Sequence, residues 1–144
     1  MDELQLPLMV EKNTELMRTA YTVSCDYAHG TTTGISAHDR ALTSRKLADP
    51  TSKPEDFMRP GHILPLRSVP GGTFDRFGHT EAAVDLCQLA GVAPVACIGE
   101  IIKEDDPKGD MARRDDCFAF AKKHNIKMIT IKDIIAYKRL NQAA

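Results

Sequence analysis

The residue types best suited to chemistry gather in one short run, Asp75-Arg76-Phe77-Gly78-His79-Thr80-Glu81. An apolar-periodic segment follows directly and predicts a helix with its first turn at Thr80–Glu81. Because unpaired N–H groups at a helix start attract anions, Arg76 and the Thr80 hydroxyl beside them could bind a phosphate. His79 could ligate a metal or transfer a proton. The alternative is a plain helix cap, a surface cation and a polar boundary residue, since short motifs are weak evidence.

Three other features carry groups that chemistry could use. The hydroxyl cluster Thr31–Thr33 is either a phosphate-holding loop or a turn whose threonines suit a strand edge. His62 follows a rigid turn predicted at Arg59-Pro60-Gly61 and opens a short strand, where it is either structural or placed for acid–base work. Glu100 interrupts the apolar run Pro94–Ile102, so either this strand face opens to solvent or the carboxylate belongs to a site. Together these groups suit proton abstraction and return on a small phosphorylated sugar.

The composition is that of an ordinary globular protein, with 144 residues, 42% hydrophobic side chains and a net charge of −1. This length predicts a single domain over residues 1–144. The charge balance argues against a nucleic-acid surface, and no apolar run reaches the roughly 20 residues of a membrane span. The start Met1-Asp2-Glu3 is acidic, whereas targeting peptides are basic. The four cysteines lack C-x-x-C spacing, so we expect small buried side chains in a reducing, cytoplasmic compartment.

Helix and strand patterns mix along the chain. Runs of β-branched and apolar residues predict strands at Thr19–Tyr27, His62–Arg67, Pro94–Ile102 and Lys127–Ile131. Capping signals and apolar periodicity predict further helices at Ser36–Leu47, Met111–Asn125 and Ile131–Leu140. The mixture predicts an α/β or α+β fold.

Six longer stretches, in one order and register over nearly the whole chain, are far more specific than any short pattern. They are LPLMVEKN (Leu6–Asn13), TAYTVSCDYAHGTTTGISAHDRA (Thr19–Ala41), RPGHILPLRS (Arg59–Ser68), RFGHTEAAVDL (Arg76–Leu86), GEII (Gly99–Ile102) and MARRDDC (Met111–Cys117). In them the sequence resembles the 3,4-dihydroxy-2-butanone 4-phosphate synthase family of riboflavin biosynthesis. The resemblance implies a homodimer with a mixed sheet packed against helices. It also implies that D-ribulose 5-phosphate is converted into 3,4-dihydroxy-2-butanone 4-phosphate and formate, with Mg²⁺ or Mn²⁺.

The resemblance further implies roles for individual residues. His62 of the R-P-G-H motif and Glu100 of the G-E motif match positions that the family needs for catalysis. The segment Arg76-Phe77-Gly78-His79-Thr80 matches the part that holds the substrate and its phosphate, and His79 within it matches a metal ligand. The pair Thr32–Thr33 falls in the T-T-G segment, which we place near the substrate.

The chain departs from the family pattern in two respects. Phe77 stands where glycine or arginine is common, which we expect to be tolerated. An upstream acidic loop of the form D-x-x-x-R-E-x-E-G-D, whose glutamate ligates the metal, has no counterpart in this sequence. We therefore expect a fold that is incomplete at its N-terminus, with hydrophobic surface uncovered. The alternative function is that of a truncated, non-catalytic remnant or subunit partner, which binds sugar phosphate at most weakly.

Overall fold

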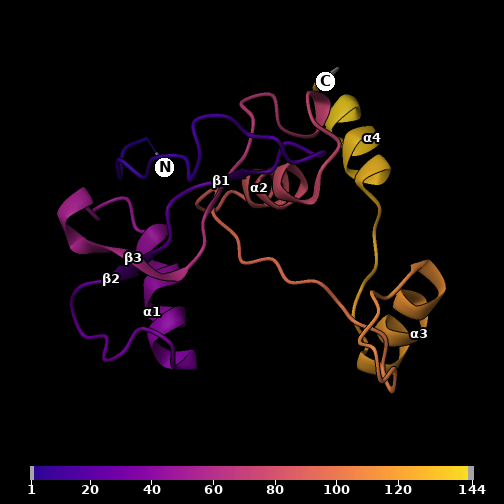
Figure 1. The fold of residues 1–144 in the computed structure, drawn as a ribbon. Helices are drawn as coiled ribbons and strands as arrows, with labels where there is room; N and C mark the ends of the chain where they lie inside the picture. Colours follow the sequence, from indigo (N-terminus) through magenta and orange to yellow (C-terminus); the bar gives the residue numbers. More distant parts are fainter. Residues whose placement is uncertain (1, 143–144) are drawn as a thin grey trace. The chain divides into compact units, whose positions relative to one another are not determined.

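The computed structural model describes residues 2–142, which pack as two compact units (Figure 1). The first unit ends at Cys97 and the second begins at Ile98. The first contains strands β1 to β4 and helices α1 and α2, and the second contains helices α3 and α4. The single domain expected over residues 1–144 stays a prediction.

The strands of the first unit form two antiparallel pairs, β1 with β4 and β2 with β3. Their bounds are β1 Ala20–Tyr21, β2 Cys25–Tyr27, β3 Phe57–Ile63 and β4 Leu66–Arg67. The strand predicted over residues 19–27 is thus present as two short strands. The α+β class is confirmed, but each pairing between these named strands is antiparallel, so the described residues do not themselves form the mixed sheet that we expected.

A large irregularity interrupts the pairing of β2 with β3. Cys25 pairs with Ile63, whereas its neighbour Asp26 pairs with Met58. Residues 59–62 therefore lie between two consecutive register points and bulge out of the ladder, as extra residues in one strand do. The turn predicted at residues 59–61 is wrong as a boundary between elements, because it lies inside β3. A Cβ on Gly61 would overlap the Cys25 backbone, so only glycine fits here.

Two helices pack in the first unit. Helix α1, Ala37–Leu47, lies beside β2 and β3 (Figure 1). The Ser36 hydroxyl caps it by accepting the Asp39 N–H at 3.0 Å, as the sequence predicted. Helix α2, His79–Leu89, follows Gly78, so Thr80–Glu81 lie in its first turn as predicted, and no side chain caps it. Thr80 therefore lies within the first turn and is not the cap. Short 3₁₀ turns at residues 54–56 and 72–74 complete the unit.

The core of the first unit is small. It consists of Leu4, Leu6, Cys25 and Phe57, with Tyr27 and Leu47 packed against it. Burial in this cluster raises the pKa of the Cys25 thiol to about 11, so this cysteine is an inert core residue, as expected. The expectation of burial is wrong for Cys97, which is exposed.

The second unit holds helices α3, Arg114–His124, and α4, Ile131–Gln142. Thr130 and Asp133 form the predicted reciprocal cap of α4, with bonds of 2.8 Å and 3.2 Å. The strands predicted over residues 94–102 and 127–131 are wrong, since both segments are irregular. Only Ile102 pairs there, in an isolated bridge with Met111. A buried strand needs neighbours on both sides, and the described residues do not supply them for this run.

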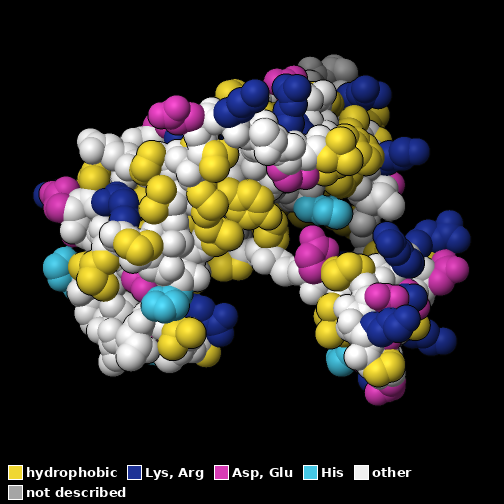
Figure 2. Space-filling model, in the orientation of Figure 1, with side chains coloured by type: hydrophobic (Ala, Val, Ile, Leu, Met, Phe, Trp, Pro, Cys, Tyr) yellow, Lys and Arg dark blue, Asp and Glu magenta, His cyan; other side chains and the backbone are white. Residues whose placement is uncertain are grey.

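Large apolar side chains are uncovered in both units, as expected for an incomplete fold. Figure 2 shows hydrophobic side chains gathered at the surface of the visible face. Leu16 is 92% exposed in the first unit, and Leu140 is 74% exposed in the second. Isolated exposed leucines are common, but so many large apolar side chains at the surface are typical of an interaction surface. None of the helices formed by residues 2–142 combines the length and apolarity needed to cross a membrane.

Candidate active site

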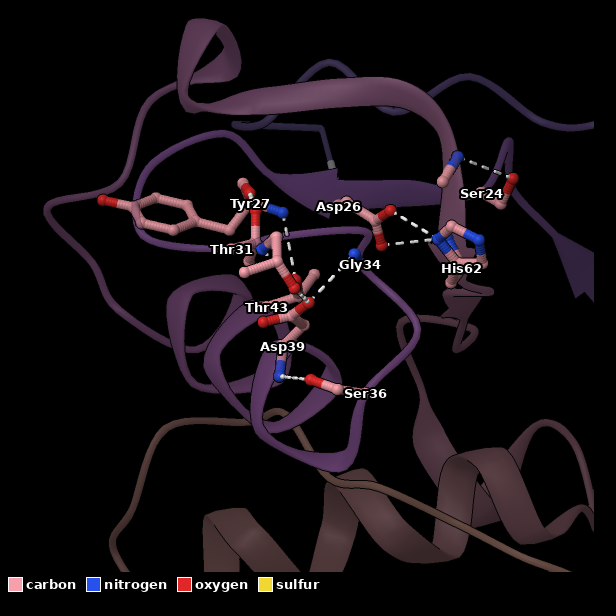
Figure 3. A network of polar contacts seen from close by, with 11 residues as sticks. Ser24, Asp26, Tyr27, Thr31, Gly34, Ser36, Asp39, Thr43 and His62 are labelled. Carbon is pink, nitrogen blue, oxygen red and sulfur yellow. Dashed lines mark hydrogen bonds and ion pairs between the residues drawn. The ribbon is translucent and has the colours of Figure 1, made fainter.

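His62 is held at two points by Asp26, which reaches it from the neighbouring strand (Figure 3). The His62 backbone N–H donates to Asp26 Oδ1 at 2.9 Å, and the ring Nδ1 lies 2.7 Å from Asp26 Oδ2. The carboxylate is buried, with 6% of its side chain exposed, while the imidazole is 42% exposed. The bulge of β3 therefore turns His62 so that one ring nitrogen meets a buried acceptor and the ring still reaches solvent.

The backbone around this pair fits closely. Gly34 has a φ of +85°, and a Cβ on it would overlap Asp26 Oδ2 and lie 2.7 Å from His62 Nδ1. The Gly61 N–H, next to His62, donates to the Ser24 hydroxyl at 3.2 Å. Glycine is required at residue 34 for its positive φ and for this approach, which fixes the loop against the histidine–carboxylate pair.

The T-T-G segment is organised by another buried carboxylate, Asp39 in the first turn of α1. Asp39 Oδ2 accepts the Thr32 N–H at 3.1 Å, the Thr32 hydroxyl at 2.8 Å and the Gly34 N–H at 3.0 Å. The Thr32 hydroxyl in particular holds the pKa of Asp39 below its ordinary value, and the two backbone donors add to this. Thr32 and Thr33 are both exposed, and the Thr32 donors are used to build the loop.

Arg76 is engaged by protein groups at the start of α2. Its Nη1 lies 2.5 Å from Oε2 of the fully buried Glu81. Its Nη2 donates to the Met17 carbonyl at 3.1 Å and to the Thr19 hydroxyl at 3.3 Å. The other Glu81 oxygen accepts the Val69 N–H at 3.1 Å. In this structure the guanidinium therefore joins α2 to two preceding segments.

The remaining residues of the R-F-G-H-T segment lie at or near the surface. Phe77 is 57% exposed, His79 is exposed, and Thr80 is half-buried. Gly78 lies close to the ion pair below it, since a Cβ there would be 2.6 Å from Glu81 Oε2 and would also crowd Arg76. The first turn of α2 thus presents His79 and free backbone N–H groups to solvent, an arrangement suited to an anion or a metal ligand.

Glu100 belongs to the second unit and lies in an irregular, exposed segment. The buried strand around it is a wrong prediction, and of the two readings its surroundings in this chain match the solvent-exposed one. Its role in catalysis stays a prediction.

The described residues do not by themselves complete a metal site. Among residues 2–142, no group of three or more histidine, cysteine, aspartate or glutamate side chains is placed to hold an ion. His79 offers one exposed imidazole at the start of α2. Mg²⁺ prefers an octahedral set of oxygen ligands, so one histidine is not sufficient to hold it.

Sequence reasoning missed three carboxylates that build this region: Asp26, Asp39 and Glu81. A signal for Asp26 was present, because a carboxylate inside an otherwise β-branched run is costly to bury without a partner. Glu81 lies in the helix-start run and was noticed only as a helix residue. Its burial depends on Arg76 and Val69, whose positions no local pattern gives.

Comparison with known proteins gives one consistent result. The family model for 3,4-dihydroxy-2-butanone 4-phosphate synthase matches residues 1–137. The 3,4-dihydroxy-2-butanone 4-phosphate synthase of Schizosaccharomyces pombe is 58% identical over 138 residues, covering 95% of this chain and 67% of that protein. A protein of Bacillus cytotoxicus, named riboflavin biosynthesis protein RibBA, is 58% identical over 136 residues, covering 94% of this chain and 33% of that protein.

A solved structure agrees with these matches. The crystal structure of a 3,4-dihydroxy-2-butanone 4-phosphate synthase in complex with two magnesium ions aligns with a TM-score of 0.86 at 47% identity. The alignment covers 98% of this chain and 69% of that one. The chain thus spans about two thirds of the length of such relatives. It belongs to the 3,4-dihydroxy-2-butanone 4-phosphate synthase family.

Proposed function

We propose that this chain carries part of the active site of a lyase that converts D-ribulose 5-phosphate into 3,4-dihydroxy-2-butanone 4-phosphate and formate. The family match over residues 1–137 carries the proposal. The atoms balance without an oxidant, because a five-carbon sugar phosphate yields a four-carbon phosphate ester and a one-carbon acid.

His62 is the residue that we propose for proton transfer at the sugar. A neutral imidazole whose Nδ1 is bonded to Asp26 retains Nε2 as a proton acceptor. An enolisation next to a carbonyl needs such a base within hydrogen-bond reach of the substrate. Glu100 is proposed as a second acid–base group, on the strength of its motif alone.

For the substrate, we propose that the start of α2 receives the phosphate. The supporting features are the free N–H groups of its first turn and the accessible Thr80. Arg76 contributes mainly by fixing this turn through Glu81. Thr33 supplies a further exposed hydroxyl in the T-T-G segment, where the Thr32 hydroxyl already donates to Asp39.

A divalent cation, Mg²⁺ or Mn²⁺, is part of the proposal, with His79 as one ligand. When bound, such an ion would stabilise negative charge on an oxygen of the substrate. Since no group of three or more histidine, cysteine, aspartate or glutamate side chains is placed to hold an ion among residues 2–142, we propose that further ligands come from water, the substrate or another segment or subunit. A homodimer and a cytoplasmic location are further parts of the proposal, and the uncovered apolar side chains are compatible with a subunit contact.

The test is a chimera in which this chain replaces the corresponding two thirds of the S. pombe relative. Formate release from ribulose 5-phosphate with Mg²⁺ is measured for the chimera and for the chain alone. We expect turnover by the chimera and none by the isolated chain. A folded chimera that releases no formate would overturn the proposal.

The competing candidate is a non-catalytic remnant that binds sugar phosphate at most weakly. The incomplete ligand set and the uncovered apolar side chains favour it for the chain as it stands. The same chimera separates the two candidates, because a remnant whose own residues have lost function would stay inactive even when the rest of the relative is supplied.

A further inference from the structure

We propose that Asp26 is a positioning residue for the reaction, which sets the tautomer and the orientation of His62. The inference rests on the proposed function for the role of His62, but the geometry behind it stands independently. Asp26 lies in the family stretch Thr19–Ala41, but the resemblance assigned it no role; it reaches His62 from β2 across 36 residues of sequence.

The two contacts of the Asp26 carboxylate fix which atoms donate and which accept. The His62 backbone N–H is an obligate donor, and it meets Oδ1 at 2.9 Å. An ionised carboxylate only accepts hydrogen bonds, so the ring Nδ1 at 2.7 Å from Oδ2 has to carry a proton. In a neutral imidazole the other nitrogen, Nε2, is then the acceptor, which is the form that a general base requires.

The surroundings hold Asp26 in place. Its side chain is 6% exposed, and the Gly34 backbone lies so close that a Cβ there would overlap Oδ2. The Gly34 N–H is in turn bonded to Asp39 at 3.0 Å. Asp26 therefore cannot turn away from the ring without moving the T-T-G loop, and the ring orientation is fixed by elements that precede β3 in the sequence.

A purely structural role for Asp26, as a partner for backbone donors, is the competing explanation. The single backbone donor on Oδ1 would satisfy that role, and the ring contact on Oδ2 would then have no effect on the histidine. The two explanations differ in what an amide does at this position. The amide oxygen would accept the backbone N–H, and its NH₂ group would face Nδ1 as a donor. The imidazole would have to move its proton to Nε2.

The experiment is Asp26→Asn, with Asp85→Asn as the matched control. Asp85 is an equally buried aspartate, 2% exposed, that accepts the N–H and the hydroxyl of Thr73. The first readout is the tautomer of His62, from the ¹⁵N and two-bond ¹H NMR signals of the imidazole in the full chain. We expect the Nδ1–H form in the parent and in Asp85→Asn, and the Nε2–H form in Asp26→Asn.

The second readout is kinetic, in the active chimera. We expect kcat to fall about 10- to 100-fold in Asp26→Asn with KM nearly unchanged, which is part of the roughly 10²–10⁴-fold that a general base supplies. Asp85→Asn is expected to retain kcat wherever it folds.

The outcomes separate the two proposals. An Nε2–H tautomer in the parent chain would overturn the positioning role without any variant, even if Asp26→Asn fails to fold. An unchanged tautomer or an unchanged kcat in folded Asp26→Asn would overturn it as well. A tautomer switch in Asp26→Asn together with an inactive parent chimera would instead support the positioning geometry and defeat the proposed function.

Discussion

The chain contains two R-x-G-H segments, residues 59–62 and 76–79, and the structure uses them differently. In each segment the arginine binds backbone carbonyls, Arg59 that of Leu4 at 2.7 Å and Arg76 that of Met17 at 3.1 Å. In each, the glycine lies where a side chain would clash. The difference lies in the buried carboxylate, since Asp26 binds the histidine of the first segment and Glu81 binds the arginine of the second.

Because of this difference, the His62 imidazole is held by a carboxylate, whereas the His79 imidazole is not held by one among the described residues. In the first segment the imidazole has a fixed orientation and one free nitrogen. In the second segment the carboxylate neutralises the cation and secures the helix start, while His79 remains exposed. The same four-residue spacing can therefore supply an oriented imidazole or an anchored helix terminus. Which of them results depends on the residue that a distant segment places beside it.

The sharpest test of this contrast removes the first histidine. In the chimera, His62→Ala is expected to lower the rate of formate release by about 10²–10⁴-fold, the range that a positioned general base supplies. His38→Ala is the matched control, because His38 is exposed on α1. If His62→Ala released formate at the parent rate, the proposed proton-transfer role of His62 would be wrong.

In the second segment, residues 76–79, we expect substitution of the buried carboxylate to lower stability. Glu81→Gln leaves the partly buried guanidinium of Arg76 without its buried counter-charge, and we expect a loss of about 3 kcal/mol in the free energy of unfolding. Urea unfolding followed by circular dichroism measures it. Glu104→Gln, which breaks an exposed 2.7 Å pair with Lys123, should leave the urea midpoint unchanged. Equal effects of the two substitutions would show that the burial of Glu81 does not matter.

Two glycines of positive φ measure how tightly the first site is packed. In Gly30→Ala the new Cβ would meet only Leu42, at 3.6 Å. The expected loss in the free energy of unfolding, about 1 kcal/mol, therefore comes from the left-handed backbone conformation alone. Gly34→Ala has a similar φ but drives a methyl group into Asp26 and His62, so it should cost clearly more in the same urea unfolding. It should also change the NMR signals of the His62 ring. A cost equal to that of Gly30→Ala would mean that the loop does not constrain the pair.

The smallest expected effect is a change in stability at acid pH that comes from Asp39. The folded-state pKa of Asp39 lies below its ordinary value of 3.8, because its carboxylate accepts the bonds of Thr32 and Gly34. Its stabilising contribution is therefore fully present above pH 3.8 and is lost as the pH falls from there through the lowered pKa. Urea midpoints measured from pH 6 downward should fall less steeply for Asp39→Asn than for the parent. Parallel curves would contradict this assignment.

Local signals predicted the helices well. Ser36 caps α1 and Thr130 caps α4, as their spacing to an acidic residue three positions later indicated. The first turn of α2 was predicted at Thr80–Glu81, where it lies, although Gly78 provides the extended N-cap residue and the threonine does not cap. The candidate site was predicted in part, since His62 was named and its partner Asp26 was not.

The apolar runs were the least informative part of the sequence. Residues 94–102 and 127–131 have the composition of buried strands, yet both are irregular in the chain. Ile98 is 51% exposed and Ile129 is 54% exposed. Strand formation depends on neighbouring strands that satisfy the backbone, so composition alone cannot establish it.

The sequence by itself determined the helix caps and the residues available for chemistry, because these depend on residue types within a few positions of one another. It also determined the family, because six stretches keep one order and register along nearly the whole chain. Only the tertiary structure decided which groups from distant segments meet. Asp26 reaches His62 across 36 residues and Arg76 reaches Met17 across 59. The first contact depends on the register shift in the pairing of β2 with β3, and the second on the path of the chain before β1. Such contacts are set by the packing of whole segments and are therefore not encoded in any local pattern.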